Sequence, residues 1–145
     1  MARTARIAAV SYVPPLHDHR GKGVDLGPLA ALVRKLHVHR PDFIVFPELC
    51  ACVGGGIKKG LDAAPELGPF AEAVGKLARD VGTALVVPFI ERASGRFYNS
   101  VPIVDSAGKL VLNYRKLYPT VSEMDAGLSP GTDVPVGECD GVTVV

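Results

Sequence analysis

Apolar residues along the chain follow two spacings, and their alternation predicts an α/β arrangement with a partly parallel sheet. Continuous apolar runs, typical of strands buried on both faces, occupy 6–13, 43–46 and 83–90. Between these runs lie two stretches in which apolar residues recur every three or four positions, the spacing of an amphipathic helix. A strand, a helix and a second strand in this order form a βαβ unit, so these strands should be parallel.

The two predicted helices have clear start and stop signals. Asp25 can cap the first helix, Pro28 lies in its first turn, and Pro41 ends it. The second helix opens at Pro65 and terminates at Gly82. Both helices therefore fit between the predicted strands without long connections.

The pattern changes to hairpins in the last third of the chain. Two strands at 98–104 and 109–114 flank the turn sequence Asp-Ser-Ala-Gly at 105–108. After an irregular stretch with Pro130-Gly131, strands at 134–138 and 142–145 form a second hairpin around Asp140-Gly141. The 145 residues have the length of one domain.

Composition and charge exclude several classes of partner. The hydrophobic share of 48% and charged share of 21% are ordinary for a globular protein. A net charge of +1, without a basic stripe, argues against nucleic acid. No apolar run approaches the roughly 20 residues that span a bilayer. Three cysteines, an odd number, fit a reducing compartment better than a disulfide framework, so we expect a soluble cytoplasmic protein.

Several short motifs carry a weaker functional signal. The pairs His17-x-His19 and His37-x-His39 supply only two ligands each, so we expect surface histidines rather than a metal site. The glycine-bearing segment 51–60 lacks the Gly-Lys-Ser/Thr ending of a phosphate loop. We interpret that segment as a mobile loop over a pocket.

Two ionisable side chains stand out because each directly follows a predicted strand. Glu48 comes after Phe46 and Pro47, at the carboxyl end of a buried strand, where open α/β sheets place their ligands. Lys116 follows the strand at 109–114. Each alone could be a solvated surface charge, and Glu48 alone could be a turn residue.

Together with their neighbours, these residues resemble the nitrilase superfamily of carbon–nitrogen hydrolases. The resemblance rests on Phe-Pro-Glu at 46–48, Phe-Tyr-Asn-Ser at 97–100 and Tyr-Arg-Lys-Leu-Tyr-Pro-Thr-Val-Ser-Glu at 114–123, in this order. The segment 115–123 is most similar to the nitrilase and cyanide-hydratase branch. The resemblance implies an α-β-β-α sandwich, with residues 1–145 as the N-terminal portion of a single carbon–nitrogen hydrolase domain.

The resemblance also implies a role for three residues. Glu48 would be the general base, Lys116 the cation beside the tetrahedral intermediate, and Glu123 the second glutamate near the lysine. A cysteine thiol is mostly protonated at neutral pH, so its attack on a nitrile or non-peptide amide needs such a base or cation. The family needs no metal or organic cofactor, and its members form homo-oligomers.

One expected residue is missing from the chain. The family's nucleophilic cysteine ends the strand that follows the last hairpin turn, and Val145 lies within that strand, so the cysteine is expected within about one short strand's length beyond it, roughly 5 residues. Cys50 and Cys139 do not match that position, and we expect both to be small buried or half-exposed thiols.

The sequence is consistent with two functions. The chain is either the inactive N-terminal half of a hydrolase for small nitriles or amides, or a truncated remnant that binds a full-length relative through an open sheet edge. A nucleotide-binding Rossmann fold is disfavoured, because no Gly-x-Gly-x-x-Gly follows the first strand.

Overall fold

The computed structural model describes residues 4–13, 24–52 and 56–145, and its main element is a six-stranded mixed sheet. The strands β1, β2 and β3 pair in parallel, which confirms the predicted βαβ units, and β4, β5 and β6 pair antiparallel. The bounds of these strands are β1 Ile7–Ala9, β2 Phe43–Val45, β3 Ala84–Val86, β4 Phe89–Ala93, β5 Arg96–Val104 and β6 Leu110–Arg115.

The strand predicted at 83–90 is two strands, which corrects the sequence interpretation. Pairing with β5 stops after Val86 and resumes at Phe89, beyond Pro88, which has no N–H to donate to a ladder. The strand β4 then continues to Ala93 and turns into β5 through Ser94 and Gly95. Both of these residues have positive φ, as a two-residue hairpin turn requires. This hairpin was not predicted.

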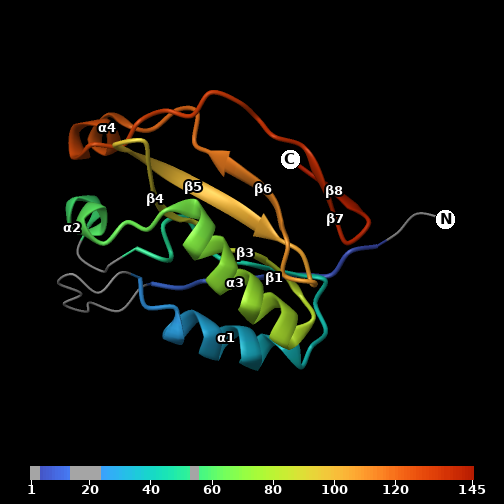
Figure 1. Ribbon diagram of the computed structural model, residues 1–145. Coiled ribbons are helices and arrows are strands. Elements are labelled where there is room, and N and C mark those ends of the chain that lie inside the picture. The colour runs from blue at the N-terminus through green and yellow to red at the C-terminus, as the bar shows by residue number, and fades with distance from the viewer. Residues whose placement is uncertain (1–3, 14–23, 53–55) are drawn as a thin grey trace.

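Two helices, α1 (Gly27–His37) and α3 (Leu67–Val81), cover one face of the sheet (Figure 1). Gly82 ends α3 with a φ of 63°, as predicted. The predicted cap of α1 is off by one residue, because Leu26 occupies the cap position and Asp25 accepts a hydrogen bond from the Gly27 N–H. The rings of Phe70 and Phe89 stack at 3.9 Å in the core between α3 and the sheet.

A second hairpin packs on the opposite face of the sheet. It consists of β7 (Gly137–Cys139) and β8 (Val142–Val144), and Cys139 is buried against Phe43 and Ile103 of the main sheet. The segment 134–136 is not part of β7, although the sequence predicted a strand there. Both faces of the sheet are thus partly covered, in agreement with the fold expected from the resemblance.

Two short helices, α2 (Ile57–Asp62) and α4 (Val121–Ala126), contact each other near one end of the sheet (Figure 1). The helix α2 overturns the expectation of a loop for residues 57–60, while 53–55 and the pair His17 and His19 lie outside the described residues. His37 and His39 are exposed, as predicted. Within the described ranges, no helix has the length and apolar character needed to cross a bilayer.

Candidate active site

Glu48 lies just beyond the end of β2, where the backbone leaves the sheet. The N–H of Phe46 still bonds to the carbonyl oxygen of Val86 at 3.0 Å, and Pro47 then ends the ladder. Leu49 turns the chain with a φ of 54°, which is uncommon for a residue with a side chain and marks a tightly determined turn. The Glu48 side chain is 59% exposed, so it reaches outward from the turn.

Lys116 is the first residue beyond β6, and its backbone is held on both sides. Its N–H donates to the carbonyl oxygen of Asn99 at 2.9 Å, and its own carbonyl oxygen accepts from Gly131 at 2.9 Å. Its ammonium nitrogen donates to Oε1 of Glu48 at 2.8 Å and to Oε2 of Glu123 at 2.9 Å. The structure therefore brings together Glu48, Lys116 and Glu123.

Glu123 is fixed by the start of α4, a feature that the sequence interpretation missed. Thr120 and Glu123 form a capping box, in which Thr120 Oγ1 accepts from the Glu123 N–H and Glu123 Oε2 accepts from the Thr120 N–H at 2.7 Å. The pattern Thr-x-x-Glu was the readable signal. The helix cap thus orients a carboxylate that is only 7% exposed toward Lys116.

The hydrogen bonds around Glu123 outweigh the effect of its burial. Burial would raise the pKa of its carboxyl group, but donors from Thr120, Lys116 and Asn99 stabilise the carboxylate and lower the pKa to about 2. Hydrogen bonds to Glu48 and Glu123 in turn raise the pKa of Lys116. Glu123 and Lys116 are therefore both ionised at neutral pH.

Asn99 is a fourth member of this cluster that sequence reasoning did not single out. Its Nδ2 donates to Oε1 of Glu48 at 2.7 Å and to Oε1 of Glu123 at 3.0 Å. The ionised carboxylate of Glu123 only accepts hydrogen bonds, so the amide nitrogen of Asn99 and not its oxygen faces it. The one available signal was the place of Asn99 in the Phe-Tyr-Asn-Ser motif.

The three cysteines of the chain are poor nucleophiles. Burial is the main cause that raises the pKa of Cys50 and Cys52 to about 12 and that of Cys139 to about 11. The Sγ of Cys50 donates to the carbonyl oxygen of Pro88 at 3.3 Å. None of these thiols is ionised to a useful extent at neutral pH.

Chemically, the cluster joins proton acceptors to a positive charge. Glu48, the more exposed carboxylate, can take a proton, and the Lys116 ammonium can stabilise negative charge that develops beside it. Elsewhere in the described residues, no group of three or more histidine, cysteine, aspartate or glutamate side chains is arranged to hold a metal ion.

The described residues thus bring two carboxylates and one ammonium group together at one end of the sheet. The family model described as carbon-nitrogen hydrolase matches residues 24–144, so the chain belongs to this family. A protein from Pseudomonas protegens described as "Hydrolase in pqqF 5'region" is 33% identical over 108 residues, which cover 69% of this chain and 36% of that protein.

Solved structures of family members have the same fold. The NitN amidase from Nesterenkonia sp. AN1 superposes with a TM-score of 0.70 and 19% identity, over 97% of this chain and 55% of its own. A CN-hydrolase superfamily protein from Xanthomonas campestris, with an arsenic adduct in its active site, superposes with a TM-score of 0.79 and 20% identity. The match covers 98% of this chain and 52% of that protein. The chain thus spans about half or less of the length of these relatives.

Proposed function

We propose that this chain carries the base and the cation of a carbon–nitrogen hydrolase for small nitriles or non-peptide amides. Glu48 is the general base, Lys116 the cation and Glu123 the glutamate that holds the lysine. The observation that carries the proposal is the Lys116 ammonium, which lies within 2.9 Å of one oxygen of each glutamate. The nitrilase branch stays a prediction, since the named structural relatives include amidases.

The proposed reaction starts at a cysteine thiol. Glu48 takes the thiol proton, the sulfur bonds to the amide or nitrile carbon, and the negative charge that forms on oxygen or nitrogen lies beside Lys116. For an amide, the proton held by Glu48 then leaves with the amine, and water hydrolyses the thioester. Because the pKa values of the chain's three thiols are about 11 or 12, we place the nucleophile outside residues 1–145.

The first experiment is to sequence the source gene through and beyond the codon for Val145. We expect the reading frame to continue and to encode a cysteine within about one short strand, roughly 5 residues. The longer product should release ammonia from butyramide, an amide bound by a mutant of the Nesterenkonia amidase. Glu48→Gln and Lys116→Gln should abolish that release.

The control is Glu138→Gln, which changes an exposed glutamate on β7 and should leave ammonia release unchanged. The 145-residue chain alone should release no ammonia from an amide or a nitrile. Release by this chain that Glu48→Ala abolishes would contradict the placement of the nucleophile. A longer product that hydrolyses butyramide equally well with Glu48→Gln would contradict the role of Glu48.

A second candidate function is non-catalytic binding to a full-length relative. The observation that favours it is the β7–β8 hairpin, which forms a separate two-stranded sheet flanked by the exposed Val136 and Val145. Pairing of such an edge with another chain is a known route to association. A stop codon after Val145, together with co-elution of the chain and a full-length relative in size-exclusion chromatography, would support this function, and a clean monomer would refute it.

A further inference from the structure

A second polar cluster is centred on Glu91, a residue of β4 that is 1% exposed. Its Oε2 accepts from Ser100 Oγ of β5 at 2.6 Å, from Asn113 Nδ2 of β6 at 2.9 Å and from Arg115 Nε at 3.0 Å. Its Oε1 accepts from Arg115 Nη2 at 2.5 Å. One buried carboxylate therefore links three strands.

This cluster and the candidate active site lie on opposite faces of the same two strands. Successive side chains of a strand point to opposite faces. Asn99 contacts Glu48 and Glu123, whereas the next residue, Ser100, contacts Glu91. Likewise, Arg115 binds Glu91 on one face, and the following Lys116 reaches the two glutamates on the other.

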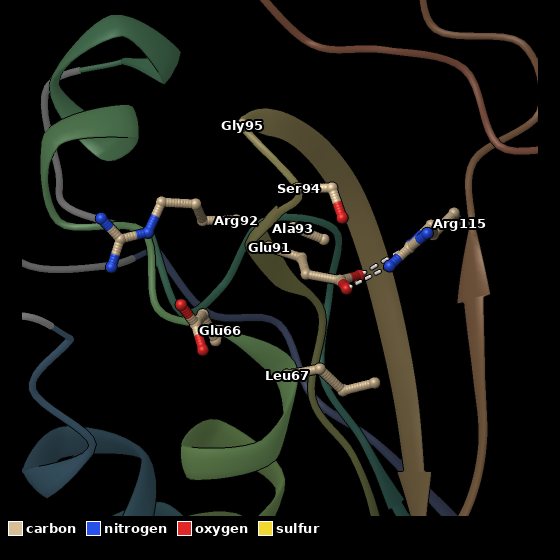
Figure 2. A pocket seen from close by; sticks show the side chains of 8 residues that line it. All are labelled: Glu66, Leu67, Glu91, Arg92, Ala93, Ser94, Gly95 and Arg115. Atoms are coloured by element: carbon tan, nitrogen blue, oxygen red, sulfur yellow. Dashed lines mark hydrogen bonds and ion pairs between the residues drawn. The ribbon is translucent and has the colours of Figure 1, made fainter.

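Figure 2 shows Glu91 and Arg115 pointing toward each other at the edge of a pocket that Glu66 and Leu67 also line. Burial would raise the pKa of Glu91, but hydrogen bonds from Arg115, Ser100 and Asn113 lower it overall, so the buried charge persists. The Arg115 guanidinium also lies 4.2 Å from the centroid of the Tyr98 ring. These contacts leave the Arg115 side chain little freedom.

The backbone around Arg115 and Lys116 is confined as well. Arg115 is the last residue of β6 and pairs with Ser100, and the Lys116 N–H continues this pairing to the carbonyl oxygen of Asn99 at 2.9 Å. A Cβ added to Gly131 would come within 2.2 Å of the Arg115 carbonyl oxygen, so the segment after α4 packs directly on it. Arg115, with its side chain held by Glu91, is thus joined by one peptide bond to the residue that carries the ammonium group.

We propose that Glu91, acting through Arg115, is a positioning residue that sets where Lys116 presents its ammonium to Glu48 and Glu123. The proposal rests on the proposed function insofar as Lys116 is the cation of the site. Glu91 does not touch the reacting groups itself, because it lies on the other face of β5. Its effect passes through one ion pair and one peptide bond.

The test is the ¹H–¹⁵N NMR spectrum of the lysine ammonium groups in the 145-residue chain, where hydrogen-bonded ammonium groups exchange slowly enough to be seen. Lys116→Arg assigns the Lys116 signal by removing it. In Glu91→Gln, which keeps the shape but not the charge, we expect this signal to shift or disappear. The matched control Glu138→Gln removes an exposed glutamate and should leave the signal unchanged.

A merely structural role for Glu91 would lower stability without moving the Lys116 signal of the folded molecules. The proposal is overturned if folded Glu91→Gln keeps the signal at its original position, or if the unchanged chain shows none. If Glu91→Gln does not fold, Ser100→Ala decides, because it removes one donor to Glu91 and should shift the signal away from its position in the unchanged chain. An unshifted signal there also overturns the proposal.

The same spectra separate this proposal from the proposed function. The signal reports where the ammonium lies and does not depend on any hydrolysis. A Lys116 signal that responds to Glu91→Gln in a chain whose longer product hydrolyses nothing supports positioning and contradicts catalysis. An unresponsive signal combined with ammonia release that requires Lys116 supports catalysis and contradicts positioning.

Discussion

Replacing Glu123 by glutamine tests whether the buried carboxylate stabilises the fold by being ionised. Glutamine keeps the size of the side chain and an oxygen that can accept from the Thr120 N–H, but it carries no charge for Lys116. In the folded chain the pKa of Glu123 is lowered from 4.5 to about 2. Glu123→Gln removes the part of the unfolding free energy that comes from this lowering of the pKa.

The magnitude follows from the shift of the pKa. A difference of about 2.5 units, at roughly 1.4 kcal/mol per unit, corresponds to about 3 kcal/mol of unfolding free energy. Because the pKa is lowered on folding, the contribution is fully present above about pH 4.5 and is lost as the pH falls through about 2. Glu123→Gln should therefore be less stable near neutral pH by up to about 3 kcal/mol, and the difference should shrink in acid.

The assay is urea unfolding followed by far-ultraviolet circular dichroism, since the chain has no tryptophan to report by fluorescence. Both proteins are compared at about pH 6, where the contribution of Glu123 is fully present, and at about pH 2.5, where most of it is lost. Glu72→Gln, an exposed position on α3, serves as the control and should change stability little at either pH. A stability difference between Glu123→Gln and the unchanged chain that is the same at both pH values would refute the reasoning.

Two further predictions concern the thiols and the packing of α3. Cys50, Cys52 and Cys139 should react with iodoacetamide at about pH 8 roughly a hundredfold or more slowly than in urea-unfolded chain, because so little thiolate is present. Rapid labelling of the folded chain would contradict the raised pKa values. Gly75→Ala should destabilise by about 1–3 kcal/mol, because its Cβ would lie 2.4 Å from a turn carbonyl oxygen. Gly68→Ala on the same helix has open space and should stabilise by up to about 1 kcal/mol in the same denaturation assay, and equal effects would contradict the packing argument.

Local patterns in the sequence predicted the parts of the fold that depend on local physics. Apolar runs and helical spacing predicted the parallel strands β1, β2 and β3 and the helix α3, and Gly82 marked the end of that helix. The break at Pro88 was also readable, because proline cannot donate to a ladder. Treating 83–90 as one strand gave too much weight to the continuous apolar run.

The residues of the candidate site were predictable only in part. Glu48 and Lys116 could be found from their places after strands, and Glu123 from the resemblance. Asn99 had only its place in the Phe-Tyr-Asn-Ser motif as a signal, and Glu91, which lies outside the site, had none, because their contacts depend on how β5 pairs with its neighbours. The ion pair of Glu91 and Arg115 joins residues 24 positions apart, and no local pattern encodes such a pairing.

The adjacent cations Arg115 and Lys116, which reach opposite faces of the sheet at the end of β6, also favour one alignment of the β5–β6 hairpin. A shift of β6 by one residue would exchange the faces of all its side chains. In one direction Arg115 would face Glu48 and Glu123 while Tyr114 replaced it at Glu91, and in the other direction the site would receive Leu117 in place of Lys116. The first shift leaves Glu91 without a cation, and the second leaves Glu48 and Glu123 without one. Leaving a buried charge unpaired costs about 3–5 kcal/mol. Two like charges next to each other in the sequence therefore make the correct alignment of the hairpin more favourable than its neighbours.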